Sequence, residues 1–176
     1  MWRQTALGLS VVAAVLTCAA TQCSGVEIVP RRDWGARAPK GRTAITNSRV
    51  PYVFIHHTTG SGCDSKASCS RSIRGHQNYH MDKNGWSDIG YSFLVGGDGR
   101  VYEGRGWGTV GAHTRGYNSN GIAISFVGNF MAQKPNQAML NAAQKLIACG
   151  IKMVIFSFPV LLIHLPAHGT CCWLCQ

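Results

Sequence analysis

The chain is poor in acidic residues: 7 Asp and Glu stand against 17 Lys and Arg among 176 residues, which gives a net charge of +10. Every acid lies at or before Glu103, so catalysis by a pair of carboxylates is excluded for residues 104–176. The positive excess favours anionic partners such as nucleic acids, membrane surfaces or bacterial wall polymers. Because 45% of the residues are hydrophobic, we expect a folded domain rather than a disordered basic tail.

The chain also lacks an uninterrupted apolar run of about 20 residues, which a membrane-spanning helix needs. Ala6–Ala20 is diluted by Ser and Thr, and Met153–Ile163 is short and broken by a proline. A basic start, the first apolar run and the small residues Cys18–Ala20 are typical of a secretory signal peptide. We therefore expect residues 1–20 to be a signal peptide, cleaved between positions 20 and 25, and the protein to be secreted without a transmembrane anchor.

Internal repeats and interdomain linkers are lacking too, and the length suits a single domain. Hydrophobic periodicity and turn residues predict the order strand, helix, hairpin, strand, helix. The predicted elements are Pro51–Ile55, Ser68–Met81 with Ser70 as N-cap, Ile89–Val95 paired with Arg100–Glu103, Ile122–Val127, and Asn136–Cys149 closed by Gly150. This order indicates a single α/β domain with a central mixed β-sheet flanked by helices.

The 8 cysteines suit an extracellular protein, where disulfides persist. Cys63 and Cys69 stand six positions apart in a polar loop, which predicts a local disulfide. Cys171, Cys172 and Cys175 form a terminal cluster that fits disulfides, metal-ligating thiolates or a free thiol.

Two adjacent histidines end the first predicted strand. Because strand side chains alternate, only one of the His56 and His57 rings can face the crevice beyond the carboxyl end of the sheet. A lone histidine is more often structural than catalytic. Tyr91, however, follows Gly90 at the start of the hairpin and is expected to project over the same end.

A second group of metal-binding residue types lies near the end of the chain. His164 and Cys172 are separated by eight positions, and Thr170 stands two positions before the cysteine. Imidazole and thiolate are good zinc ligands, and three protein ligands plus a water make a catalytic zinc site. The competing interpretation is that these residues belong to a disordered tail.

Six segments between about Val26 and Gly150 form a set of motifs in a consistent order. They are Val29–Gly35, Phe54–Thr58, Tyr79–Asp82, Asp88–Val95, Val101–Trp107 and Gly121–Phe126. Through these segments the chain closely resembles the short secreted peptidoglycan recognition proteins of animals, which are relatives of phage and bacterial N-acetylmuramoyl-L-alanine amidases.

The resemblance implies an amidase-like domain over residues 26–172, with a groove that binds peptidoglycan and its muropeptides. It implies hydrolysis of the amide between N-acetylmuramic acid and L-alanine by zinc-bound water. One Zn²⁺ would be held by His56, His164 and Cys172, provided that the last two reach the site. Tyr91, and with it Thr170, would stabilise the oxyanion.

The resemblance also implies which residues contact the substrate and how further cysteines pair. The substrate-binding positions fall on His80, Asn84, Gly85, Trp86, Tyr91, His113 and Asn118. Gly85 and Trp86 look like the pair of family members that favour diaminopimelate-type stems. Cys23 and Cys149 resemble a second disulfide of some vertebrate members.

The sequence departs from the family pattern from about residue 151 onward. Residues 163–173 keep a histidine, a threonine and a cysteine at matching offsets, but the Arg-Asp, Pro-Gly and final helix of family amidases are missing. Either the zinc site is retained, or this end is an alternative or misassembled tail and the protein is a non-catalytic peptidoglycan receptor or bactericidal lectin. Nucleic-acid binding is not expected, because the basic residues are scattered and no motif reads base edges.

Overall fold

The computed structural model describes residue 23 and residues 25–164, apart from the side chains of residues 158, 163 and 164. The elements occur in the order β1 (Ile28–Val29), η1 (Arg31–Trp34), β2 (Val50–His57), α1 (Lys66–Asp82), β3 (Phe93–Val95), β4 (Val101–Glu103), β5 (Gly121–Phe126), α2 (Gln137–Lys152) and β6 (Phe156–His164). Here η1 is a short 3-10 helix.

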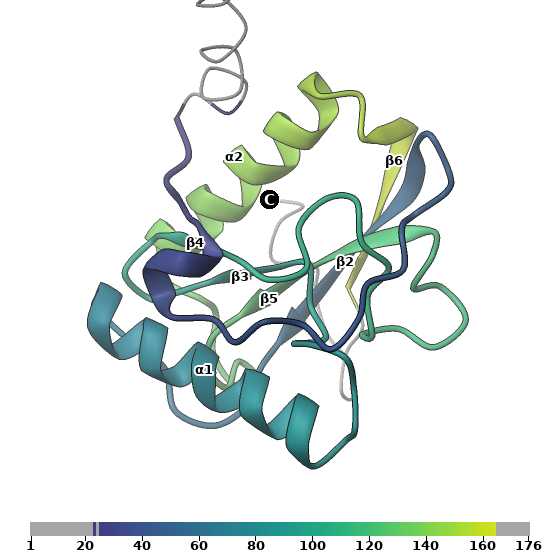
Figure 1. Ribbon diagram of the computed structural model, residues 1–176. Coiled ribbons are helices and arrows are strands. Elements are labelled where there is room, and N and C mark those ends of the chain that lie inside the picture. The colour runs from purple at the N-terminus through teal and green to yellow at the C-terminus, as the bar shows by residue number, and fades with distance from the viewer. Residues whose placement is uncertain (1–22, 24, 165–176) are drawn as a thin grey trace, which may run out of the picture.

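Six strands form one mixed sheet in the order β1-β4-β3-β5-β2-β6. Only β3 and β4 pair antiparallel, and the other neighbours are parallel. Helix α1 lies on one side of the sheet and α2 on the other (Figure 1). The predicted α/β fold with a mixed sheet flanked by helices is confirmed.

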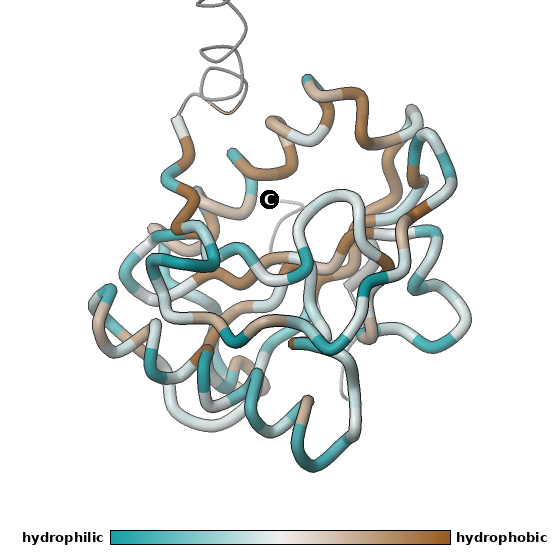
Figure 2. Tube along the Cα trace, viewed as in Figure 1, coloured by the Kyte–Doolittle hydropathy of each residue, from teal (hydrophilic) through white to brown (hydrophobic). Residues whose placement is uncertain are grey.

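Alternation along β5 separates two hydrophobic cores. Ile122, Ile124 and Phe126 join the core that α2 covers, which also contains Leu146. The core on the α1 side is smaller and holds Trp34 with residues of α1, β3 and β4. In Figure 2 the hydrophobic colours gather on the central strands and along α2, whereas α1 is largely hydrophilic. Helix α1 therefore presents a broad polar surface to solvent.

The helix boundaries differ from the predicted ones. Helix α1 is capped by Ser65 rather than Ser70, because the Ser65 side chain accepts from Ser68 N and Ser68 reciprocates in a capping box. Ser70 is instead a buried residue inside the helix. Helix α2 runs past Gly150 to Lys152, and the Phe156 ring packs where a side chain at Gly150 would stand. Gly150 is thus a site of close packing and not a C-cap.

The apolar run near the end forms the edge strand β6, which is absent from the order of elements predicted from hydrophobic periodicity. It pairs parallel to β2, and its register shifts between the pair Val50 with Phe156 and the pair Tyr52 with Leu161. Pro159 lies within the shifted stretch. A proline lacks the N–H that a central strand needs, so its place at a sheet edge next to an irregularity is the expected one.

Two disulfides are present among the described residues, Cys63–Cys69 and Cys23–Cys149. The predicted local disulfide is confirmed, and so is the pairing of Cys23 with Cys149 that the resemblance implied. The second closes a long loop, with a sequence separation of 126 residues, and ties the start of the described chain to α2. No helix within residues 25–164 is long and apolar enough to cross a membrane.

The packing of α2 on the sheet generates a stability prediction. Leu146 is completely buried in the larger core, so Leu146→Ala removes buried methyl groups and leaves a cavity. We expect the free energy of unfolding to fall by about 2–5 kcal/mol. Urea unfolding with intact disulfides measures it. The exposed neighbour Gln144→Ala is the control and should change little; equal losses would contradict the assignment of this core.

Candidate active site

The two histidines at the carboxyl end of β2 face opposite sides of the sheet. The His56 ring lies 5.6 Å from the Tyr91 ring and 5.7 Å from the His113 ring. The His57 ring lies beside Phe130, and its Nδ1 accepts a hydrogen bond of 2.9 Å from Phe130 N. The alternation predicted from the sequence is confirmed, and His56 is the histidine that faces Tyr91.

Tyr91 lies between two histidines. Its ring is 5.6 Å from that of His56 and 5.7 Å from that of His80. Burial raises the pKa of the Tyr91 phenol. The phenol therefore keeps its proton at neutral pH, so it can donate a hydrogen bond.

His80, in the last turn of α1, stacks on an indole. Its ring centroid lies 4.8 Å from that of Trp86. Burial, with smaller contributions from His76 and Arg105, lowers the pKa of His80 to about 4. Its Nδ1 accepts from Gly90 N at 3.1 Å, so the neutral ring carries its proton on Nε2. His80 thus offers a neutral N–H donor.

His113 lies on the loop between β4 and β5, and Asn118 shapes this loop. The Asn118 side-chain oxygen accepts from His113 N at 2.8 Å and from Thr114 N at 2.9 Å. The Thr114 hydroxyl lies 3.0 Å from His113 Nδ1 and 3.2 Å from His56 Nε2. Burial, followed by the charges of His56 and Arg105, lowers the pKa of His113 to about 3. Thr114 bridges the two imidazoles, a role that the sequence analysis missed.

The five rings of His56, His80, Trp86, Tyr91 and His113 form one connected group, which we call the ring cluster. Of the other predicted substrate-binding residues, Asn118 supports the His113 loop. Asn84 and Gly85 lie exposed in the turn after α1, where Gly85 has a φ of 71°. They stand beside the ring cluster in sequence but add no ring to it.

Arg105 and Gly90 bring the loops of the ring cluster together, and neither was predicted. The Arg105 guanidinium donates to Ile89 O at 2.7 Å and to Val110 O at 2.8 Å. A Cβ at Gly90 would stand 2.8 Å from the Trp86 ring and against Ala112 O. Only glycine allows this close approach. Both residues lie in the motif segments, but no periodicity or spacing distinguishes them.

Of the three zinc ligands implied by the resemblance, only His56 has a side chain that the structure describes. His56 is described, while Thr170 and Cys172, like Cys171 and Cys175, lie outside the described residues. His164 is described by its backbone alone, which pairs with Ile55 of β2. Among the side chains that the structure describes, which do not include that of His164, no three of His, Cys, Asp or Glu are grouped so that they could hold a metal ion.

Comparisons with known proteins give consistent results. The family model for N-acetylmuramoyl-L-alanine amidase matches residues 46–159. Peptidoglycan-recognition protein SC1a of Drosophila melanogaster is 45% identical over 139 residues, covering 79% of this chain and 75% of the relative. Peptidoglycan recognition protein 1 of Bos taurus is 48% identical over 141 residues, covering 80% and 73%.

A solved structure extends the similarity to three dimensions. It is the ectodomain complex of peptidoglycan recognition proteins LCa and LCx with bound tracheal cytotoxin. The match has a TM-score of 0.77 and 44% identity, and it covers 79% of this chain and 84% of the other.

The lowered pKa of His80 generates a pH prediction. In the unfolded chain this imidazole takes up a proton near pH 6.5, whereas in the folded protein it does so only at about 4. The unfolded state therefore binds more protons between these values, and the free energy of unfolding must fall as the pH falls. We expect His80→Gln to weaken this loss, measured by urea unfolding at about pH 7 and pH 4.5.

The two proteins share every other titrating group, His113 included, so the difference between their pH dependences reports His80. An identical loss of stability in the wild type and in His80→Gln would contradict a buried, neutral His80.

Proposed function

The chain belongs to the N-acetylmuramoyl-L-alanine amidase family and, within it, to the peptidoglycan recognition proteins; from this membership we propose that it binds muropeptides across the ring cluster. We further propose that it hydrolyses the amide between N-acetylmuramic acid and L-alanine with the help of zinc. The observation that carries the proposal is the contact between His56 and a half-buried, protonated Tyr91 at the carboxyl end of β2.

The ring cluster suits an amphipathic ligand such as a sugar with a short peptide. Aromatic faces offer apolar area, and the indole of Trp86 and the imidazole of His80 each add a polar N–H. The low pKa values of His80 and His113 keep both rings neutral at pH 7, so binding relies on stacking and hydrogen bonds. The complex of relatives with tracheal cytotoxin supports a muropeptide as the ligand. The pair Gly85 and Trp86 favours a diaminopimelate-type stem.

The three proposed donors are of the types that zinc prefers, and two of them lie near the end of the chain. His56 supplies one imidazole, and His164 and Cys172 would supply the nitrogen and sulfur that zinc prefers. The pairing of β6 with β2 brings the His164 backbone beside the residue that precedes His56. When bound, zinc would lower the pKa of a water to about 7 and supply a nucleophile at neutral pH.

Tyr91 would stabilise the charge that develops on the scissile carbonyl. Its phenol stays protonated because it is buried, and a donor held in place costs no reorganisation during the reaction. Arg105 fixes the loop behind it, since Arg105 N donates to Tyr91 O at 3.0 Å while its guanidinium donates to Ile89 O. Thr170 would be a second donor.

The second candidate function is a non-catalytic peptidoglycan receptor or bactericidal lectin. The altered sequence from about residue 151 favours it, because the Arg-Asp and Pro-Gly that accompany the zinc ligands in family amidases are missing. In either case we propose a secreted protein with residues 1–20 as its signal peptide. The two disulfides, which persist in oxidising compartments, support this location.

Metal content separates the two candidates. We expect the purified secreted protein to contain one zinc ion per chain, and we expect His164→Ala and Cys172→Ala each to remove it. Elemental analysis after dialysis measures the ratio. His168→Ala and Cys175→Ala are matched controls in the same segment and should retain zinc. A metal-free wild type that still binds peptidoglycan would leave the receptor as the function.

Tyr91→Phe tests the catalytic role directly. Loss of the donor should lower the rate of amide hydrolysis by roughly 100-fold or more, while muropeptide affinity changes little because the ring remains. Single-turnover kinetics and calorimetric titration measure the two quantities. The exposed Tyr79→Phe is the control. Parallel losses of rate and affinity would contradict the role.

A further inference from the structure

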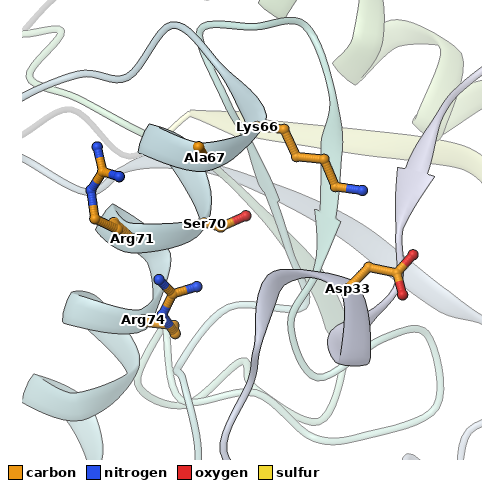
Figure 3. A pocket seen from close by; sticks show the side chains of 6 residues that line it. All are labelled: Asp33, Lys66, Ala67, Ser70, Arg71 and Arg74. Atoms are coloured by element: carbon orange, nitrogen blue, oxygen red, sulfur yellow. The ribbon is translucent and has the colours of Figure 1, made fainter.

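A cationic depression lies between η1 and the first half of α1, outside the ring cluster. It has a volume of about 490 Å³. The residues that line it are Asp33, Lys66, Ala67, Ser70, Arg71 and Arg74 (Figure 3). At a rise of about 1.5 Å per residue, Ser70 and His80 are about 15 Å apart along the helix. The depression and the ring cluster are therefore separate sites on one helix.

The cations of the depression have no acidic partner among the described residues. Lys66, Arg71 and Arg74 are absent from the ion pairs of this part of the chain, and Asp33 pairs with Arg32 at 3.2 Å.

Each of the other acids is occupied elsewhere in the fold. Asp82 pairs with Arg37, Asp88 with Arg31, and Glu27 and Asp98 with Arg100. Asp64 accepts from Ser68, and Glu103 accepts from the backbone of Arg31. Asp33 is thus the one carboxylate that lines the depression, and it already pairs with Arg32, so the three cations of this face meet a single, paired acid.

Two donors in the depression are held in place before any ligand arrives. Arg74 Nη1 donates to Trp34 O at 2.6 Å, and its side chain packs against Gly35, which leaves the other guanidinium N–H groups for a ligand. Ser70 is 7% exposed and lines the same depression. In Figure 3 its hydroxyl points toward the space between α1 and η1.

This combination suits a phosphate group. A guanidinium with free N–H groups, an ammonium and a hydroxyl together match the oxygens of a phosphate through charge-assisted hydrogen bonds. Large exposed hydrophobic side chains, which anchor a protein to a membrane surface, occur at six described positions, and none lines the depression. Aromatic side chains for base stacking are also missing from its lining.

We propose that the depression binds phosphate groups of the anionic polyol-phosphate polymers that are attached to bacterial cell walls. The protein would then contact the wall at two places, with peptide and sugar at the ring cluster and phosphate at α1. The second contact requires neither zinc nor the ring cluster, so it stands or falls independently of the proposed function. Two linked contacts raise the overall affinity for the wall beyond that of either alone.

The test is calorimetric titration of the whole secreted protein with a synthetic glycerol-phosphate oligomer at low ionic strength, where screening is weak. We expect Lys66→Gln/Arg71→Gln to weaken binding by about tenfold and to make it less dependent on salt. This pair leaves the bond between Arg74 and Trp34 intact. Ser70→Ala, which keeps every charge, should weaken binding as well.

The matched control is Arg42→Gln/Arg49→Gln, which removes the same charge from two exposed positions elsewhere. It should bind the oligomer like the wild type, and all variants should keep the muropeptide affinity of the wild type. An equal loss in the control would show attraction by net charge alone and overturn the proposal. Binding of phosphatidylglycerol vesicles that depends on Lys66 and Arg71, with unchanged oligomer binding, would assign the depression to membranes and also overturn it.

Discussion

A single buried carboxylate holds together the elements on which the ring cluster depends. Asp88 is 3% exposed and accepts from Gln77 at 2.7 Å and from Ile89 N at 2.8 Å, and it pairs with Arg31 at 3.1 Å. These contacts join α1, η1 and the loop that leads to Tyr91. A buried ion pair adds little net stability, but removing one partner leaves an uncompensated charge. Asp88 therefore acts mainly by fixing the positions of α1, η1 and the loop before Tyr91 relative to one another, and adds little net stability.

Charge is distributed unevenly over the molecule, and this separates two modes of recognition. The ring cluster contains neutral imidazoles, because burial and nearby cations hold the pKa values of His80 and His113 low. The outer face of α1 carries unpaired cations instead. A wall fragment that combines glycopeptide with phosphate would match both surfaces at once. Three of the 17 basic residues are thus concentrated on this helix face, in addition to the long-range field of the +10 net charge.

Prediction from the sequence succeeded where a local pattern decides the structure. The run before His56 became β2, Gly121–Phe126 became β5, and the apolar stripe around Leu146 became α2. Predictions failed where tertiary contacts compete with local rules. Ser70 looked like a cap but is buried, because the capping box forms at Ser65 and Ser68. The strand β6 was missed because its proline is tolerated only at a sheet edge, and strand order is invisible in a single sequence.

The sequence by itself determined the fold class, the local Cys63–Cys69 disulfide and the residue types of the candidate site, because short-range periodicity, cysteine spacing and the motif segments specify them locally, whereas the long-range pair Cys23–Cys149 was implied only by the family resemblance. Only the tertiary structure decided that Thr114 bridges His56 and His113, that Arg105 joins two loops, and that Gly90 allows them to meet. It also decided that Lys66, Arg71 and Arg74 form no ion pair within the described part of the chain. These are contacts between residues far apart in the chain, and they exist only once the sheet has brought its loops to one end.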